Sequence, residues 1–236
     1  MQNRFLSWFL CPTEEILGHA LAPLRTFLLD YFQQESEIMY AENELRFTAV
    51  FDLLIQQLPK ESSARSDLER HRQLLSNLLV LGSDTSGLAQ PSAKFQLTQI
   101  GSAIASLIKA ESTLRPVVVQ IEDAHWLDNE SQTLFQQLEA ALQHYPVAFL
   151  CTARPQKGGE LFQLGVSNEI PQTNIHLSPL DYENVRQLGQ QILRTRIADE
   201  LVSLLAERTN ANPFFVEQLL LDMRSQGSIM TKLDAR

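Results

Sequence analysis

The sequence has few cysteines and an excess of acidic over basic residues. Its two cysteines, Cys11 and Cys151, have no metal-ligand spacing and are too few to staple 236 residues with disulfides. These features favour a reduced, cytoplasmic setting. The formal net charge of −9 argues against nucleic acid as the main partner, because a phosphate backbone requires a basic face.

Long apolar runs are also absent. No stretch reaches the length that spans a bilayer, so we expect no membrane partner. The apolar patch Phe5–Leu10 has one nearby cation and no small-residue cleavage site, which argues against a signal peptide. The remaining composition, 44% apolar and 20% charged, is that of a globular protein with room for one α/β domain and a small helical one.

The most informative stretch is Arg115–Asp128, RPVVVQIEDAHWLD. Its valines and isoleucine predict a strand that is buried on both faces of a parallel sheet. Glu122 and Asp123 follow at the carboxyl end of this strand, where ligands of parallel sheets bind. Buried carboxylates are costly unless they meet a cation. The pattern therefore predicts a Walker B strand, whose acids hold Mg²⁺ on a nucleotide phosphate and position a water.

Apolar periodicity predicts strands and helices along the rest of the chain. Strands are expected at Arg4–Leu10, Val147–Thr152 and Thr173–Leu177. Helices are expected at Glu14–Gln34 with a kink at Pro23, Asn43–Leu58, Leu74–Leu81, Lys94–Ala110, Glu130–His144 after the cap Asp128, Asp181–Leu193, Ala198–Arg208, and Pro213–Arg224 after the cap Asn212. Lys60–Arg70 reads as a polar loop or helix start, while Gly82–Pro91 and Gly158-Gly159 read as loops.

Strands that alternate with helices, followed by helices alone, predict a three-layer α/β fold with a parallel sheet and then a helical lid. We place the α/β core at residues 1–178 and the lid at residues 179–236. Right-handed crossovers bring the carboxyl ends of all the strands to one edge, which carries Glu122, Asp123 and Arg154.

Four blocks in this order resemble a known family: IEDAHWLD, FLCTARP, LSPLDYENV and TNANPFFVEQLL. They are similar to the AAA-like P-loop ATPase domains of the STAND class, which occur in large bacterial signalling proteins beside adenylate cyclase, kinase or repeat modules. The resemblance extends from about Phe5 to Arg224. It implies an ATP-binding switch that hydrolyses MgATP slowly, with fused or partner output domains and possible self-association.

The resemblance also implies roles for individual residues. Glu122 looks like the Mg²⁺-side acid and Asp123 like the acid that orients water. Arg154 matches the sensor of the terminal phosphate. Asn212-Pro213 matches the lid motif near the base, although Ala211 stands where the family usually has glycine.

One family element is missing from the sequence, because no G-x-x-x-x-G-K-[ST] occurs in it. In the family this P-loop follows a first strand that lies between the fourth and fifth strands. We therefore expect the chain to be a fragment, to leave two strands without a neighbour, and to bind ATP weakly by itself.

Several motifs keep a structural alternative. We expect the pair His125-Trp126 to pack under the next helix rather than to contact a ligand. Arg154, which precedes a proline, could stabilise a loop instead of sensing a phosphate. Asn212 with Phe214-Phe215 could be a cap and apolar anchor alone. Cys11 and Cys151 are expected on either side of the central strand, too far apart for a disulfide. The remaining histidines have no ligand spacing.

Two further functions stay open. A nucleotide-independent interaction scaffold on the same fold is favoured by the missing P-loop. An unrelated α/β hydrolase would require the nucleophile motif G-x-S-x-G, which the sequence lacks.

Overall fold

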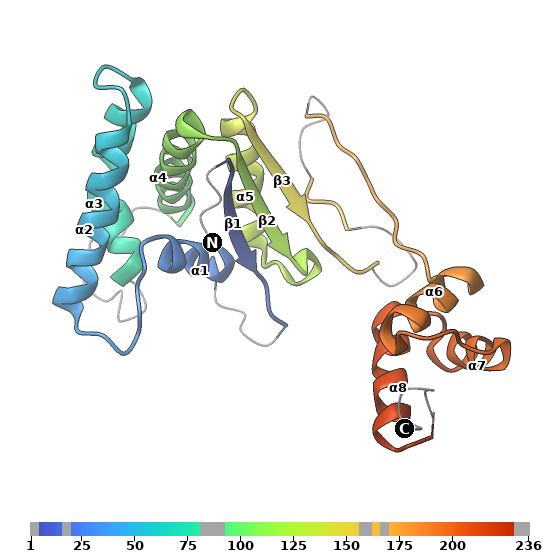
Figure 1. Ribbon diagram of the computed structural model, residues 1–236. Coiled ribbons are helices and arrows are strands. Elements are labelled where there is room, and N and C mark those ends of the chain that lie inside the picture. The colour runs from blue at the N-terminus through green and yellow to red at the C-terminus, as the bar shows by residue number, and fades with distance from the viewer. Residues whose placement is uncertain (1–4, 16–19, 81–92, 156–161, 166–169, 229–236) are drawn as a thin grey trace. The chain divides into compact units, whose positions relative to one another are not determined.

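The computed structural model describes residues 5–15, 20–80, 93–155, 162–165 and 170–228, and it divides into two compact units, Met1–Pro171 and Gln172–Arg236 (Figure 1). Each unit has its own core of buried apolar side chains. The sequence placed a division at residues 178/179. Among the described residues no helix is both long and apolar enough to cross a membrane.

The first unit contains a parallel sheet of three strands in the order β1-β2-β3. The strands are β1 (Ser7–Pro12), β2 (Val117–Glu122) and β3 (Val147–Cys151). Ile121 of β2 lies in register between Cys11 and Cys151. The expected separation of the two cysteines by the central strand is therefore confirmed, and both are free thiols. An α/β fold with a parallel sheet is thus observed.

The helices of this unit connect the strands (Figure 1). They are α1 (Ala22–Tyr31), α2 (Tyr40–Gln57), α3 (Ser63–Val80), α4 (Ala93–Leu114), the short 3₁₀ turn η1 (Ala124–Trp126) and α5 (Asn129–Leu142). Along the chain, the helices α1 to α4 come between β1 and β2, and α5 comes between β2 and β3. The Asp128 side chain caps α5 by accepting from the Ser131 N–H, as the sequence predicts.

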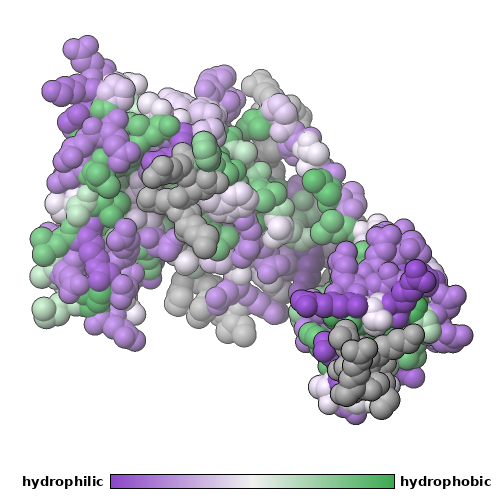
Figure 2. Space-filling model, viewed as in Figure 1, coloured by the Kyte–Doolittle hydropathy of each residue, from purple (hydrophilic) through white to green (hydrophobic). Residues whose placement is uncertain are grey.

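The core of the first unit lies on one face of the sheet. Side chains from alternate strand positions enter the core together with residues of α1 to α5, and we call this side of the sheet the covered face. The strand residues of the covered face are Phe9, Cys11, Val117, Val119, Ile121, Val147 and Phe149. The intervening positions form the bare face, and none belongs to the core: Trp8, Leu10, Val118, Gln120, Ala148 and Leu150. Trp8, Leu10 and Leu150 are exposed. Hydrophobic residues are visible at the surface in Figure 2.

In the described residues, core packing is therefore seen on one face of the sheet, and the second outer layer of the expected three-layer arrangement stays a prediction. The reason is the direction of the connections. Both crossovers step the same way across the sheet, from β1 to β2 and from β2 to β3. Right-handed crossovers that step in one direction place all their helices on one face.

One sequence expectation for the first unit is wrong, one is confirmed, and two lie outside the described residues. The helix expected at Glu14–Gln34 begins only at Ala22, so Pro23 stands in its first turn, where proline is tolerated, and introduces no kink. Of the two readings of Lys60–Arg70, a loop or a helix start, the helix start is confirmed, because α3 begins at Ser63. The loops expected at Gly82–Pro91 and Gly158-Gly159 lie outside the described residues.

The second unit is helical, with α6 (Tyr182–Leu193), α7 (Asp199–Thr209) and α8 (Pro213–Ser225). Its core joins residues of all three helices: Val185, Leu193, Ile197, Val202, Leu205, Val216 and Leu220. Gly189 on α6 leaves room for Ile197 of the connection between α6 and α7, because an added Cβ would lie 2.7 Å from Ile197 Cδ1. Asn212 caps α8, as predicted, and Asp181, which was expected to be the first residue of its helix, caps α6.

Two expectations for the second unit are wrong. Thr173–Leu177 is not a strand, because no described strand lies beside it to accept its backbone hydrogen bonds. Phe214 and Phe215 are exposed, so they do not anchor α8; Val216 and Leu220 do this instead. The two rings pack against each other, with centroids 5.5 Å apart.

Candidate functional site

The carboxyl end of β2 is fixed by backbone contacts from both neighbouring strands. Asp123 adopts a left-handed conformation with φ 51°, which turns the chain sharply from β2 into η1. The Thr13 hydroxyl donates to the carbonyls of Glu122 and Asp123, at 2.8 and 2.6 Å. On the other side, the Asp123 N–H donates to Thr152 Oγ1 at 3.1 Å, and the Ala124 N–H donates to Thr152 O at 2.8 Å. The turn is therefore tied to the ends of β1 and β3.

The two acids at this turn have different surroundings. Glu122 is half-buried, and its Oε1 accepts a hydrogen bond of 2.8 Å from Gln120 Nε2. Gln120 Oε1 in turn accepts from Trp8 Nε1 at 2.8 Å, so a relay on the bare face orients the Glu122 carboxylate. The Asp123 side chain is 55% exposed and free to meet a ligand or water.

Arg154 follows β3 at the same edge of the sheet. Its N–H donates to His125 Nδ1 at 3.3 Å, and this ring nitrogen lies 3.9 Å from Asp123 Oδ1. Because Nδ1 accepts, the proton of neutral His125 belongs on Nε2, which is buried and has no partner among the described residues. His125 also stacks against Trp126, with ring centroids 4.7 Å apart. His125 therefore packs against Trp126, and its ring also lies near Asp123 and the Arg154 backbone.

The structure thus brings together three of the five predicted site residues: Glu122, Asp123 and Arg154. Asn212 and Pro213 belong to the second unit, where Asn212 Oδ1 accepts from the Phe214 N–H at 3.0 Å and Pro213 begins α8. Ala211 has φ 54°, a left-handed conformation that glycine adopts more readily, as the family pattern implies.

Sequence reasoning missed the residues that position the acids. The turn at Asp123 is held by Thr13, which follows β1, and by Thr152, which follows β3. Glu122 is oriented by Gln120, two positions earlier on β2, and Gln120 is itself bonded to Trp8 of β1. Alternation along β2 gave one usable signal, because Gln120 and Glu122 are two positions apart and therefore share a face.

The acid pair suits a magnesium ion that is shared with a phosphate. Mg²⁺ is usually held by one or two protein carboxylates, with phosphate and water completing its shell. Glu122 and Asp123 match that donor set. No group of three or more His, Cys, Asp or Glu side chains that could hold a metal occurs in the described part of the chain.

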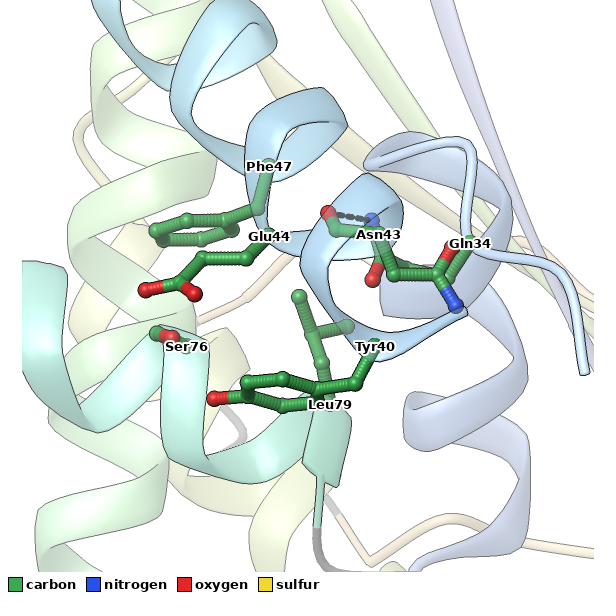
Figure 3. A pocket seen from close by; sticks show the side chains of 7 residues that line it. All are labelled: Gln34, Tyr40, Asn43, Glu44, Phe47, Ser76 and Leu79. Carbon is green, nitrogen blue, oxygen red and sulfur yellow. Dashed lines mark hydrogen bonds between the residues drawn. The ribbon is translucent and has the colours of Figure 1, made fainter. Parts of the chain in front are cut away.

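A small cavity of about 70 Å³ lies between α2, α3 and the residues before α2 (Figure 3). Gln34, Tyr40, Asn43, Glu44, Phe47, Ser76 and Leu79 line it. Ligand pockets usually have about 300–1,000 Å³, so this cavity has room for a few waters and not for a nucleotide. None of its lining residues comes from the carboxyl edge of the sheet.

Glu139 on α5 is an acid that the fold buries. It is 8% exposed, and its Oε2 has no hydrogen-bond partner among the described residues. Burial raises the pKa of Glu139 from 4.5 to about 7. Between these values the folded chain holds a proton that the unfolded chain has lost. The stability that this group contributes is therefore complete below pH 4.5 and is lost as the pH rises through 7.

We expect Glu139→Gln to raise the free energy of unfolding by about 1–2 kcal/mol at a pH near 8, with allowance for solvent screening. Near pH 4 the variant should match the parent. Urea denaturation at both pH values measures the difference. The exposed Glu61→Gln is the matched control and should change stability little at either pH. An equal effect of Glu139→Gln at both pH values would contradict the assignment.

Comparison with known proteins gives little further information. No family model matches the chain, and no solved structure matches it. An uncharacterized protein of Rhizobium meliloti (strain 1021) is 26% identical over 124 residues, which cover 50% of this chain and 11% of that protein. The matched region is therefore a small part of that relative.

Proposed function

We propose that the first unit is the sheet core of an ATP-binding switch domain of the AAA-like STAND class and that the second unit is its helical lid. The observation that carries the proposal is the carboxyl edge of the sheet. There, Glu122 and Asp123 follow the central strand, and Arg154 follows its neighbour. An acid pair beside a cation is the arrangement that phosphoryl chemistry requires.

In this proposal MgATP supplies the metal and the scissile phosphate. Glu122, oriented by Gln120, holds the metal through its shell. Asp123 lies exposed at a rigid turn and orients the attacking water. Arg154 reads the terminal phosphate, and its backbone position is set by His125. Asn212 and Pro213 contact the base from the lid. Hydrolysis would move the lid and so signal to a fused or partner output domain.

The chain supplies only part of such a site. Backbone N–H groups that surround the phosphates usually contribute much of the affinity for a nucleotide. In P-loop proteins the motif G-x-x-x-x-G-K-[ST] supplies these groups, and the 236 residues contain no such motif. The outer edge of β3 has no neighbouring strand among the described residues, and the bare face carries none of the described core. These features leave room for one further strand and a helix, which is what a P-loop segment would add.

The 236-residue chain should bind MgATP weakly, with a dissociation constant above about 1 mM by isothermal titration calorimetry. A chain extended by an in-frame strand, P-loop and helix before β1 should bind in the micromolar range and hydrolyse ATP slowly. In that longer chain Asp123→Asn should lower the hydrolysis rate by about 100-fold with little effect on binding. The half-buried Asp67→Asn on α3 is the control.

The experiments on the 236-residue chain and on the extended chain test different parts of the proposal. Micromolar binding by residues 1–236 would contradict the need for a separate cradle. An extended chain that carries the loop and neither binds nor hydrolyses ATP would contradict the nucleotide function itself.

A nucleotide-independent interaction scaffold is the second candidate. The exposure of Trp8, Leu10 and Leu150 on one sheet face favours it, because an apolar patch of this kind often marks a protein contact. The two candidates differ in the DNA upstream of Met1. An in-frame glycine-rich loop with Lys-Ser or Lys-Thr supports the ATPase. A ribosome-binding site directly before Met1 supports the scaffold.

A further inference from the structure

One side of the cavity between α2 and α3 is lined by oxygen atoms that have no hydrogen-bond partner. They belong to the Glu44 carboxylate and to the hydroxyls of Tyr40 and Ser76, which make no side-chain hydrogen bond among the described residues. In Figure 3 these oxygens extend to the same side of the cavity. Ser76 differs here from Ser102 and Ser106 on α4, whose hydroxyls donate to carbonyls of their own helix. Its hydroxyl is therefore available to a ligand in the cavity.

The amide groups of the same cavity use their N–H donors within the chain. Gln34 Nε2 donates to the Phe32 and Asn43 carbonyls, at 2.7 and 3.0 Å. Asn43 Nδ2 donates to the Glu35 carbonyl at 2.8 Å. An amide nitrogen carries two N–H groups, so those of Gln34 are both engaged. The cavity still offers mainly hydrogen-bond acceptors, and a ligand for it must bring donors.

Glu44 is also without a cation from its own helices. The other acids of α2 and α3 each form an ion pair with an arginine: Glu42 with Arg46, Asp52 with Arg72, Asp67 with Arg70, and Glu69 with Arg65. These pairs engage every arginine of the two helices, which contain no lysine. In the part of the chain that the structure describes, Glu44 has no ion pair. A positively charged ligand therefore complements the cavity.

A primary ammonium group meets these requirements. It carries one positive charge and three N–H donors, and the cavity presents one carboxylate and two hydroxyls. The rings of Phe47 and Tyr40 also line the cavity, and an aromatic ring attracts a nearby cation. A volume of about 70 Å³ has room for a few waters, and so for an ammonium group with the methylenes next to it.

We propose that this cavity binds a primary alkylammonium group, which belongs either to a free amine or to a lysine side chain of another protein. The ammonium pairs with Glu44 and donates to Ser76 and Tyr40. The remainder of the ligand lies outside, where Tyr40 is 61% exposed and Met39 is 77% exposed and both offer apolar contact. The inference does not depend on the nucleotide function, because none of the lining residues comes from the carboxyl edge of the sheet.

The first test is a titration of the full 236-residue chain with n-butylammonium chloride, followed by ¹H–¹⁵N NMR. We expect saturable shifts of the backbone signals of Tyr40, Glu44 and Ser76, with a dissociation constant in the millimolar range, because such a ligand makes few contacts. Butyltrimethylammonium keeps the charge and lacks the N–H donors, so it should bind about tenfold more weakly or less. The absence of saturable shifts at these residues, or an equal response to the quaternary ion, would overturn the proposal.

Two variants locate the charge that the ligand recognises. Glu44→Gln keeps the size of the side chain and should raise the dissociation constant for n-butylammonium about tenfold, because a charge-assisted hydrogen bond is lost. Glu37→Gln removes the same charge from the exposed segment before α2, does not line the cavity, and should leave the affinity unchanged within about twofold. If both variants weaken binding equally, the ligand responds to general negative charge and the site is refuted.

A second titration identifies the source of the ammonium group. A short peptide with a central lysine between apolar residues is compared with n-butylammonium. If the ligand is a lysine of another protein, the peptide should bind about tenfold more tightly, since its apolar neighbours contact Tyr40 and Met39. Equal affinities assign the cavity to free amines. The same peptide with an Nζ-acetylated lysine has lost the charge and should not bind, and saturable shifts with it would contradict the ammonium assignment.

Discussion

Phe135→Ala is expected to lower the free energy of unfolding of the first unit by about 3–5 kcal/mol. Phe135 is fully buried on α5, and it packs into the core that joins the helices to the covered face of the sheet. Truncation removes apolar contact area and leaves a cavity that the parallel strands cannot close, because they are held in register by backbone hydrogen bonds. Urea denaturation followed by circular dichroism measures the loss.

The exposed Leu45→Ala on α2 is the control for this prediction and should cost less than about 0.5 kcal/mol. A loss below about 1 kcal/mol for Phe135→Ala would mean that α5 is not docked on the sheet as described. The turn at Asp123 leads directly into α5, so a loosely docked helix would also leave the candidate site without support.

Glu111→Ala is expected to cost about 3 kcal/mol, because it leaves two hydrogen-bond donors and one ion-pair partner without their shared carboxylate. Glu111 is buried at the end of α4, where it accepts from Tyr31 OH at 2.6 Å and from Ser7 Oγ at 2.9 Å. Arg115 Nε lies 3.5 Å from the same carboxylate and has no hydrogen-bond partner in the described part of the chain. Burial, and then Glu111, raise the pKa of Tyr31 well above 10, so the phenol remains a donor at neutral pH.

Tyr31→Phe tests this cluster more gently and should cost about 1–2 kcal/mol, since it removes one donor and leaves Glu111 paired with Ser7. Combining it with Glu111→Ala should give a loss smaller than the sum of the two, because the partners belong to one network. Strict additivity in urea denaturation would show that the cluster does not act as a unit.

Much of the α/β unit follows from local sequence. Val117, Val119 and Ile121 gave β2 its buried face, and β2 proved to be the central strand. The caps Asp128, Asp181 and Asn212 lie immediately before helices, since their side chains satisfy the first free N–H groups. These features depend on interactions within a few residues, so the sequence alone carries them.

The features that the sequence did not predict depend on distant neighbours. Thr173–Leu177 has the composition of a strand, but a strand requires a partner. The bare sheet face depends on the order in which strands are crossed, which periodicity does not encode. Glu139 looks like an exposed helical acid in the sequence, but the fold buries it. Local pattern determines which elements form, whereas their partners determine which faces are buried.

The candidate site divides in the same way. Glu122 and Asp123 were predictable, because acids after a buried strand lie at the edge where ligands bind. The hydrogen bonds that shape the turn were not predictable, because Thr13 and Thr152 come from other strands. His125 was assigned to packing, yet its ring contacts the backbone of Arg154.

The single stepping direction of the crossovers also limits how the bare face can ever be covered by the same chain. A right-handed connection reaches that face only if it steps the opposite way, from a strand beyond β3 back towards β1. Such a strand would reverse the order of the sheet beside β3. A reversal of strand order in a parallel sheet opens a crevice at the carboxyl ends, where ligands bind. Here that crevice would open beside Thr152 and Arg154, next to the turn that carries Asp123.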